Sequence, residues 1–210
     1  MTTRPGIVYL LDDEPGLIKA LTRLLRAAGF EVRGFTEPAA LLAAFRPGEL
    51  NCLVLDLAMP AIGGLEFQQQ LTHAGLLVPI VFLTGHGDIP TGVRAIKAGA
   101  VDFLTKPVDD AELIRAVHAA LRVAAERRAA IATAAVMSAR LATLTPRERD
   151  VLRHVVLGKL NKQIAADLGT GEQNIKIHRG RVMAKMGVTS VAGLVRIAEK
   201  LGLESDSPVG

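Results

Sequence analysis

The chain contains little cysteine, few aromatic residues and no long apolar run. Its 210 residues include a single cysteine, Cys52, no tryptophan and 3% aromatic residues. One cysteine cannot form an intramolecular disulfide or a multi-thiol zinc site, which excludes a disulfide-stapled secreted domain and favours a reducing, cytoplasmic location. The longest apolar segments, 76–83 and 129–139, are shorter than the roughly 18 residues that span a bilayer. We therefore expect a soluble protein without an export signal or a membrane partner.

The charge of the chain is divided between its two parts. Half of the residues are hydrophobic and 22% are charged, which excludes a chain that is disordered throughout. Residues 1–123 hold 11 basic and 13 acidic side chains, whereas residues 124–210 hold 14 basic and 8 acidic ones. The acidic first part suggests a cation or phosphoryl site, and the basic second part suggests binding to nucleic acid or another anion.

The first part has the alternating pattern of a parallel α/β sheet. Short apolar runs at 7–11, 32–35, 52–55, 80–83 and 101–104 are each followed by a segment with helical spacing. Runs such as 52–55 and 80–83 are continuously apolar, as buried parallel strands are. The pattern predicts a doubly wound α/β domain. If its strand order is the flavodoxin-like 2-1-3-4-5, the first and third strands are neighbours.

The second part is helical throughout. An alanine-rich stretch without glycine or proline predicts one helix over 111–139, either a semi-rigid linker or a helix packed on the first domain. Thr145, Pro146 and Glu148 have the spacing of a capping box, which starts the next helix. Asn161 is predicted to cap a helix over 162–168, followed by a glycine turn and helices over 172–186 and 190–200.

Acidic residues follow two strands of the predicted sheet. Asp12 and Asp13 come just after the first strand, and Asp56 comes just after the third. The carboxyl ends of parallel strands share one edge, so the three carboxylates should converge and favour Mg²⁺. Thr84 and Lys106 end the fourth and fifth strands at the same edge. Together these groups are typical of phosphoryl transfer, with Asp56 as the nucleophile.

The motifs at these strand ends resemble the receiver domain of two-component response regulators. They are Leu11-Asp12-Asp13-Glu14, Leu55-Asp56-Leu57-Ala58-Met59-Pro60 with Gly64, Leu83-Thr84-Gly85 and Asp102-Phe103-Leu104-Thr105-Lys106-Pro107, and the run 84–88 resembles the FixJ branch. The resemblance implies that Asp56 accepts phosphate from a histidine kinase. It also implies that Asp12, Asp13, Asp56 and the Ala58 carbonyl hold Mg²⁺, that Lys106 and Thr84 bind the phosphoryl oxygens, that Phe103 is a switch residue and that the bond before Pro107 is cis.

The helix over 172–186 carries an exposed polar stripe that suits the major groove of DNA. We predict that Arg179 and Lys176 read bases, with Gln173 and Asn174 as further candidates. Lys162, Arg181 and Lys185 are predicted backbone contacts. His178 is ambiguous, since a lone histidine on a helix is more often packed or phosphate-facing than a metal ligand.

The basic helices resemble the LuxR-type helix-turn-helix of the NarL/FixJ family. The similarity covers about 141–201 and includes Leu144-Thr145-Pro146-Arg147-Glu148-Arg149, Gly158-Lys159-Leu160-Asn161-Lys162-Gln163-Ile164-Ala165 and Ile175-Lys176-Ile177-His178-Arg179. It implies that the last helix dimerises through Val191, Leu194, Val195 and Ala198.

The whole chain is thus interpreted as a phosphorylation-activated transcription regulator rather than an enzyme. The expected domains are a receiver at 1–123, a helical linker at 124–140, a DNA-binding domain at 141–203 and a flexible tail at 204–210. The expected partners are a histidine kinase, which we place on the first helix around 15–25, promoter DNA, a second copy of the chain and RNA polymerase. The alanine-rich helix is a second candidate for pairing two chains.

Two other readings compete with this one. A phosphohydrolase of the haloacid-dehalogenase type would need a second aspartate two residues after the nucleophile, where this chain has Ala58. A phosphate-independent DNA-binding protein would use the receiver only as a dimer scaffold, and the intact acidic cluster argues against it. The sequence does not specify the stimulus, the kinase, the operator, or activation as against repression.

Overall fold

The computed structural model describes residues 6–60, 62–85 and 89–202, and the expected tail at 204–210 and the motif positions 86–88 lie outside them. The chain forms two compact units that divide between Arg128 and Ala129. Within the described residues, no helix combines the length and the apolar character needed to cross a membrane.

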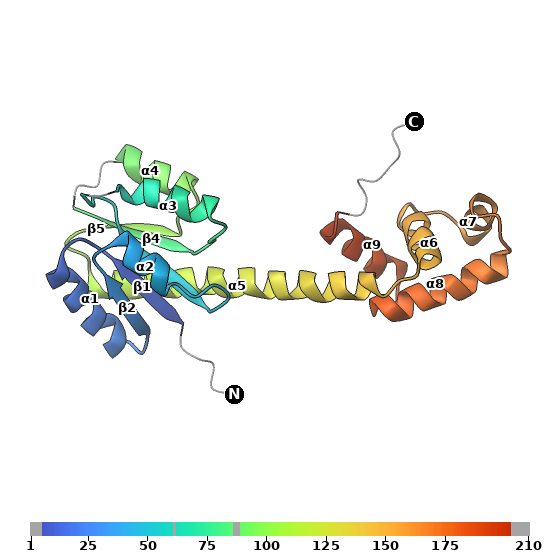
Figure 1. The fold of residues 1–210 in the computed structure, drawn as a ribbon, viewed down its shortest axis with the longest axis horizontal. Coiled ribbons are helices and arrows are strands. Elements are labelled where there is room, and N and C mark those ends of the chain that lie inside the picture. The colour runs from blue at the N-terminus through green and yellow to red at the C-terminus, as the bar shows by residue number, and fades with distance from the viewer. Residues whose placement is uncertain (1–5, 61, 86–88, 203–210) are drawn as a thin grey trace. The chain divides into compact units, whose positions relative to one another are not determined.

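The first unit is built on a parallel sheet of five strands (Figure 1). The strands are β1 (Ile7–Leu11), β2 (Glu31–Phe35), β3 (Asn51–Asp56), β4 (Ile80–Thr84) and β5 (Asp102–Thr105). Their order is β2-β1-β3-β4-β5, which confirms the predicted flavodoxin-like topology. All residues of β1, β3 and β4 are buried, because helices cover both faces of the sheet.

Helices cover both faces of this sheet and enclose two apolar cores. Helix α1 (Pro15–Ala27) and the first turns of α5 (Asp110–Ala142) cover one face, while α2 (Pro38–Ala44), α3 (Gly64–His73) and α4 (Ile89–Lys97) cover the other (Figure 1). Alternate residues of each strand point to opposite faces. Leu10 and Val54 therefore pack with α1 and α5, while Leu11 and Leu55 pack with α3.

Helix α5 continues well past the sheet. It buries Leu113, Val117 and Leu121 against the first core, and then every residue from 125 to 136 is exposed. Because these side chains are exposed, the helical state of this stretch depends mainly on the high propensity of alanine. The helix ends at Ala142, three residues beyond the predicted end at Ala139.

The second unit is a small helical domain around a third core. It contains α6 (Pro146–Val156), α7 (Asn161–Asp167), α8 (Glu172–Met186) and α9 (Val191–Lys200). The capping box of α6 is formed in both directions: Thr145 Oγ1 accepts from Glu148 N at 3.3 Å, and Glu148 Oε2 accepts from Thr145 N at 2.9 Å. Apolar side chains from all four helices meet in the core, and Met137 and Leu141 of α5 pack against it.

One predicted cap is wrong. Leu160, not Asn161, is the N-cap residue of α7, and Asn161 is the first residue inside the helix. The backbone N–H of Leu160 donates to Gln163 Oε1 at 2.8 Å. The side chain of Asn161 instead accepts a hydrogen bond from Arg179 on α8, so it is not available to cap its own helix.

Candidate functional site

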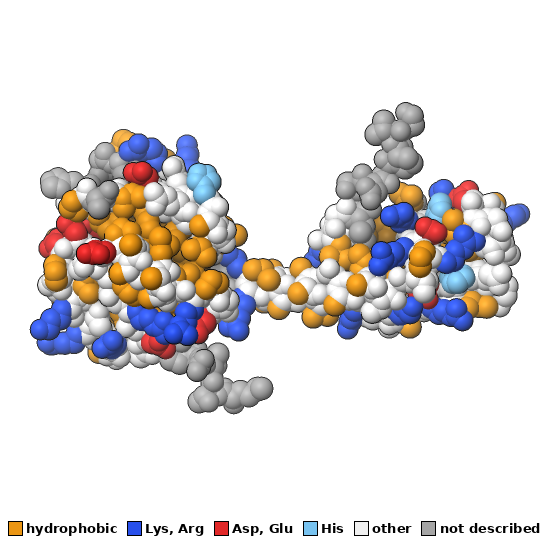
Figure 2. Space-filling model, viewed as in Figure 1, with side chains coloured by type: hydrophobic (Ala, Val, Ile, Leu, Met, Phe, Trp, Pro, Cys, Tyr) orange, Lys and Arg blue, Asp and Glu red, His pale blue; other side chains and the backbone are white. Residues whose placement is uncertain are grey.

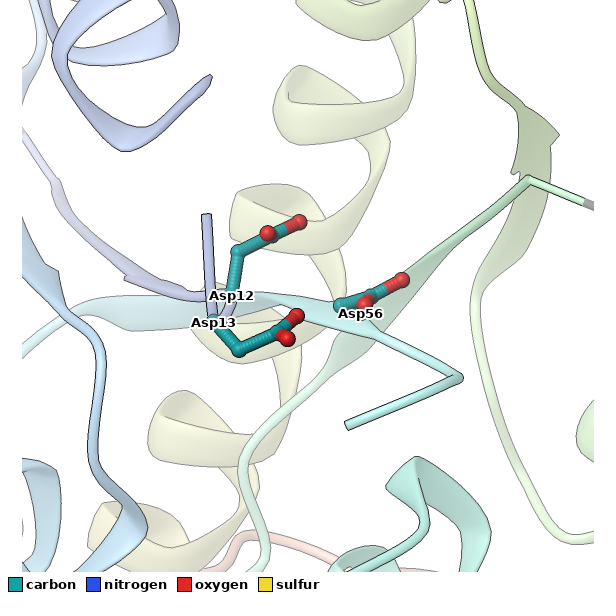
Figure 3. A group of neighbouring side chains, drawn as sticks. All are labelled: Asp12, Asp13 and Asp56. Atoms are coloured by element: carbon teal, nitrogen blue, oxygen red, sulfur yellow. The ribbon is translucent and has the colours of Figure 1, made fainter. Parts of the chain in front are cut away.

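Three carboxylates gather at the carboxyl edge of the sheet. Leu11 of β1 is paired with Leu55 of β3, so the residues that follow them, Asp12 and Asp56, lie side by side at that edge. Carboxylate oxygens of Asp12, Asp13 and Asp56 all lie within 4.8 Å of one another, and Figure 3 shows the three side chains clustered there. The predicted convergence of these residues is therefore present in the structure.

The charge of the cluster is only partly balanced. Asp12 is 2% exposed and Asp56 is 4% exposed, whereas Asp13 is open to solvent. The ammonium of Lys106 lies 2.7 Å from Asp12 Oδ2 and 3.2 Å from Asp56 Oδ1. Buried carboxylates are costly unless they are paired, so one ammonium among three carboxylates leaves a net negative site.

The pKa values of the buried groups reflect this imbalance. Burial raises the pKa of Asp56 despite the opposing charge of Lys106, and the neighbouring charge of Asp12 raises it further. Burial by itself lowers the pKa of Lys106. The hydrogen bond to Asp12 and the negative charges of Asp12 and Asp56 outweigh this effect, so the pKa of Lys106 is raised. Lys106 therefore keeps its positive charge at the site.

The donors at this edge fit a hard divalent cation. All three side chains offer oxygen, the ligand type that Mg²⁺ prefers. Asp56 Oδ1 is fully buried and accepts no hydrogen bond of good geometry from the described residues, although Lys106 is close to it. The backbone N–H of Ala58 acts against the effect of burial and lowers the pKa of Asp56. Asp12 Oδ1 also accepts from the backbone N–H of Glu14 at 2.9 Å, so Asp12 caps the loop as well as facing the cluster.

The other predicted residues of the first unit end the next two strands. Asp56 is paired with Leu83, and Thr84 with Thr105, which brings Thr84 and Lys106 to the same edge. Thr84 is 2% exposed, and its carbonyl accepts from Lys106 N at 2.7 Å. The Lys106–Pro107 bond is cis.

Phe103, the predicted switch residue, belongs to β5. It is partly buried against the core beneath α3 and α4. Its ring lies 3.3 Å from the point where a Cβ would stand on Gly92 of α4. The glycine thus leaves room for the ring beside that helix.

The second unit contains the predicted helix-turn-helix, formed by α7 and α8. The sequence prediction placed eight polar residues on or near it. The side chains of Gln173, Lys176 and Arg181 in α8 are exposed and form no hydrogen bond or ion pair with another described residue. Lys162 is exposed on α7. Lys and Arg side chains are spread over the face of this domain that Figure 2 shows. These groups are available to a ligand.

The remaining four predicted DNA-binding residues have partners or are partly buried. Arg179 Nη1 donates to Asn161 Oδ1 at 2.7 Å, and Asn174 donates to Thr170 Oγ1 at 3.2 Å. Lys185 Nζ lies 2.6 Å from the buried carboxylate of Glu148. His178 has a buried Nδ1 with no hydrogen bond to the described residues. Sequence reasoning did not anticipate these contacts, because neither Asn161 nor Glu148 is near its partner in the chain.

The predicted dimer residues of α9 divide into two pairs. Leu194 and Ala198 are each 1% exposed and belong to the core of the domain itself, which makes them unavailable to a second chain. Val191 and Val195 stay partly exposed. Only the second pair is placed to meet a partner.

Comparison with known proteins finds one family match within each of the two units. Residues 8–118 match the response regulator receiver domain, and residues 142–198 match the bacterial regulatory proteins of the luxR family. Nodulation protein W of Bradyrhizobium diazoefficiens is 44% identical over 201 residues, which cover 96% of this chain and 88% of that protein. The transcriptional regulatory protein FixJ of Rhizobium meliloti is 42% identical over 192 residues, covering 91% and 94%.

Solved structures agree with these matches. The response regulator StyR superposes with a TM-score of 0.80 at 44% identity, covering 93% of this chain and 99% of that one. Full-length FixJ from B. japonicum gives a TM-score of 0.57 at 37% identity, covering 96% and 99%. A receiver domain followed by a LuxR-type DNA-binding domain makes a transcription regulator rather than a classical enzyme. The chain therefore belongs to the two-component response regulators with a LuxR-type DNA-binding domain, in the family that includes FixJ and nodulation protein W.

Proposed function

We propose that Asp56 accepts a phosphoryl group from a histidine kinase. The observation that carries this proposal is the convergence of three carboxylates and Lys106 at the carboxyl edge of the sheet. A carboxylate oxygen of Asp56 attacks the phosphorus of a phosphohistidine, the N–P bond breaks, and its electron pair stays on the imidazole. The product on this chain is an acyl phosphate.

Mg²⁺ is the proposed cofactor of this transfer. Asp12, Asp13, Asp56 and the carbonyl of Ala58 would hold it, and the bound ion would neutralise charge on the transferring oxygens. Lys106 supplies a second positive charge to the phosphoryl group, and the Thr84 hydroxyl donates to one of its oxygens. Movement of Thr84 toward the phosphoryl group frees space for Phe103, which changes the surface formed by α4, β5 and α5.

The first helix is the proposed docking surface for the kinase. An open groove of about 1010 Å³ lies along α1. Its lining includes the cationic side chains of Lys19, Arg23 and Arg26, together with Leu24. This surface begins immediately after the acidic cluster, so a kinase helix seated there would bring its phosphohistidine toward Asp56.

Phosphorylation is proposed to pair two chains. Helix α4 exposes Val93 and Ile96, which are 47% and 48% exposed, on the surface that Phe103 adjoins. The exposed stretch of α5 adds Ile131 and Val136, which are 69% and 52% exposed. Val191 and Val195 of α9 are a third candidate contact. Burial of such apolar side chains favours association.

Helix α8 is the proposed DNA-reading element. Gln173 and Lys176 are free to reach base edges in the major groove. Lys162 and Arg181 are free to bind phosphates of the DNA backbone. Arg179 would have to release Asn161 before it could read a base. A pair of chains then binds two half-sites about one turn of DNA apart and recruits RNA polymerase.

The test is the intact mass of the full chain after incubation with Mg²⁺ and acetyl phosphate, beside an Asp56→Asn variant. A gain of one phosphoryl group that the variant lacks supports the proposal. If neither acetyl phosphate nor a phosphorylated histidine kinase gives an adduct, the phosphate-independent DNA-binding reading replaces it. Turnover of a small phosphoester would instead favour the phosphohydrolase reading. That reading is disfavoured because Ala58 occupies the position of the second aspartate that such an enzyme needs.

A further inference from the structure

The recognition helix α8 is held at its C-terminal end by the last turn of α5. The guanidinium of Arg140 donates from Nη1 to the carbonyl of Met186, the last residue of α8, at 3.0 Å. The next residue, Gly187, has φ +68°, and a Cβ built on it would collide with the Arg140 guanidinium. The left-handed backbone favours glycine here, and a larger residue would also push the Arg140 guanidinium away from its present position.

A second contact joins the end of α8 to the segment between α5 and α6. Lys185 Nζ lies 2.6 Å from Glu148 Oε2 and 3.1 Å from the carbonyl of Thr143, the residue that follows α5. Glu148 is 3% exposed and also forms the capping box of α6. The last turn of α8 is thus bonded to the segment where α5 ends and α6 begins.

The last turns of α5 belong structurally to the DNA-binding unit. Met137 and Leu141 pack against the apolar core of that unit. Arg140 lies between them on the same helix. The other end of α5 buries Leu113 and Val117 against the receiver sheet. One helix therefore contributes to the receiver core at its start and holds the recognition helix at its end.

The contact between Arg140 and Met186 helps to set the position of the C-terminal end of helix α8. Helix α8 has 15 residues, which corresponds to about 22 Å. The two free polar groups proposed to read bases, Gln173 and Lys176, lie in its first two turns, at the opposite end from Met186. Ile175, Val182 and Met186 anchor α8 in the core of the domain, and the bond from Arg140 adds a tether at its C-terminal end. Loss of that tether would let the C-terminal end shift and the helix tilt about its packed face. Its base-reading groups would then be displaced in the groove.

We propose that Arg140 is a positioning residue for DNA recognition, acting through its bond to the end of α8. This inference rests on the proposed role of α8 in reading DNA. Arg140 itself need not touch DNA. Its loss should change how well the chain discriminates its preferred sequence, because discrimination depends on the angle of α8, whereas non-specific affinity depends mainly on net charge.

The experiment compares full-length Arg140→Ala with Arg128→Ala. Arg128 lies on the same helix, and its exposed side chain has no hydrogen bond or ion pair with another described residue, so its removal reproduces the loss of one charge alone. The probes are a duplex selected by the parent chain from a random-sequence pool and a scrambled duplex of the same length. Both are measured at one salt concentration, on protein treated with Mg²⁺ and acetyl phosphate.

Arg140→Ala should lower the affinity for the selected duplex relative to the scrambled one by about tenfold, the factor that one charge-assisted hydrogen bond supports. Arg128→Ala should leave that ratio unchanged. Arg140→Lys should recover part of the ratio, because an ammonium still donates to the Met186 carbonyl. An equal loss on both duplexes, or the same ratio in both alanine variants, would overturn the proposal.

Amide hydrogen exchange tests the contact without DNA. In Arg140→Ala, exchange should become faster in the last turn of α8 and unchanged in the strands of the receiver. Unaltered exchange in α8 would refute the positioning role by itself. If the parent chain selects no duplex, the proposed DNA-binding function of α8 fails, and the exchange experiment still decides whether Arg140 holds the helix.

Discussion

Replacement of Gly64 by alanine should disable the phosphoacceptor loop without unfolding the receiver. Gly64 begins α3 and donates its N–H to the carbonyl of Leu57 at 2.9 Å. A Cβ on Gly64 would stand 2.5 Å from the backbone oxygen of Asp56 and 2.9 Å from Leu57 Cα. Ordinary contact begins at 3.4 Å, so the Asp56 backbone must retreat by about 0.9 Å. A displacement of about 1 Å at a reacting group costs on the order of a hundredfold in rate.

The assay is the rate of adduct formation from acetyl phosphate and Mg²⁺, followed by intact mass. Gly63→Ala is the matched control, because Gly63 has φ −64° and nothing within 4 Å of an added Cβ. The control should react at close to the parent rate, and Gly64→Ala about a hundredfold more slowly. Far-UV circular dichroism should show the same helix and sheet content in both. Equal rates for the two variants would refute the steric argument.

Three further predictions concern single side chains. In Lys106→Met, the three carboxylates lose the ammonium that partly balances their charge, so they should depend more on Mg²⁺. Addition of Mg²⁺ should therefore raise the melting temperature of the variant more than that of the parent. An equal or smaller rise would contradict the charge balance described for Asp56. The hydrogen bond from Lys185 lowers the pKa of Glu148 in the folded chain, which adds stability above its usual value of 4.5 that is lost as the pH falls through the lowered value. The free energy of unfolding of Glu148→Gln should therefore approach that of the parent below pH 4.5, in acid titrations monitored by circular dichroism, and a constant gap would refute the assignment. Burial raises the pKa of Cys52 to about 12, so iodoacetamide at pH 8 should label the chain only after denaturation, and rapid labelling of the native protein would show that β3 opens.

The fold of the first unit and its sheet edge were predictable from local patterns. Continuous apolar runs mark buried parallel strands, and polar residues that follow each run must lie at the common carboxyl edge. The strand order places β1 beside β3, so Asp12 and Asp56 converge whatever the details of the loops. The family and the fold followed from this reasoning together with the resemblance of the motifs.

The contacts of the DNA-binding unit were not predictable in this way. Arg179 pairs with Asn161, and Lys185 pairs with Glu148, across 18 and 37 residues of sequence. A helical stripe shows which residues share a face, but it does not show which of them a neighbouring helix engages. The burial of Leu194 in the core of its own domain was not predictable for the same reason. The sequence pattern of an apolar helix face is the same whether that face packs on its own core or on a second chain.

The most direct test of the proposed phosphorylation switch measures DNA affinity and oligomeric state together, before and after phosphorylation. The probe is the duplex selected by the parent chain, and the proteins are the parent and Asp56→Asn, each with Mg²⁺ and with or without acetyl phosphate. Phosphorylation should convert the parent to a dimer and tighten its binding, while Asp56→Asn stays unchanged in both. Tight binding that is the same for the unphosphorylated parent, the phosphorylated parent and Asp56→Asn would contradict the proposed switch.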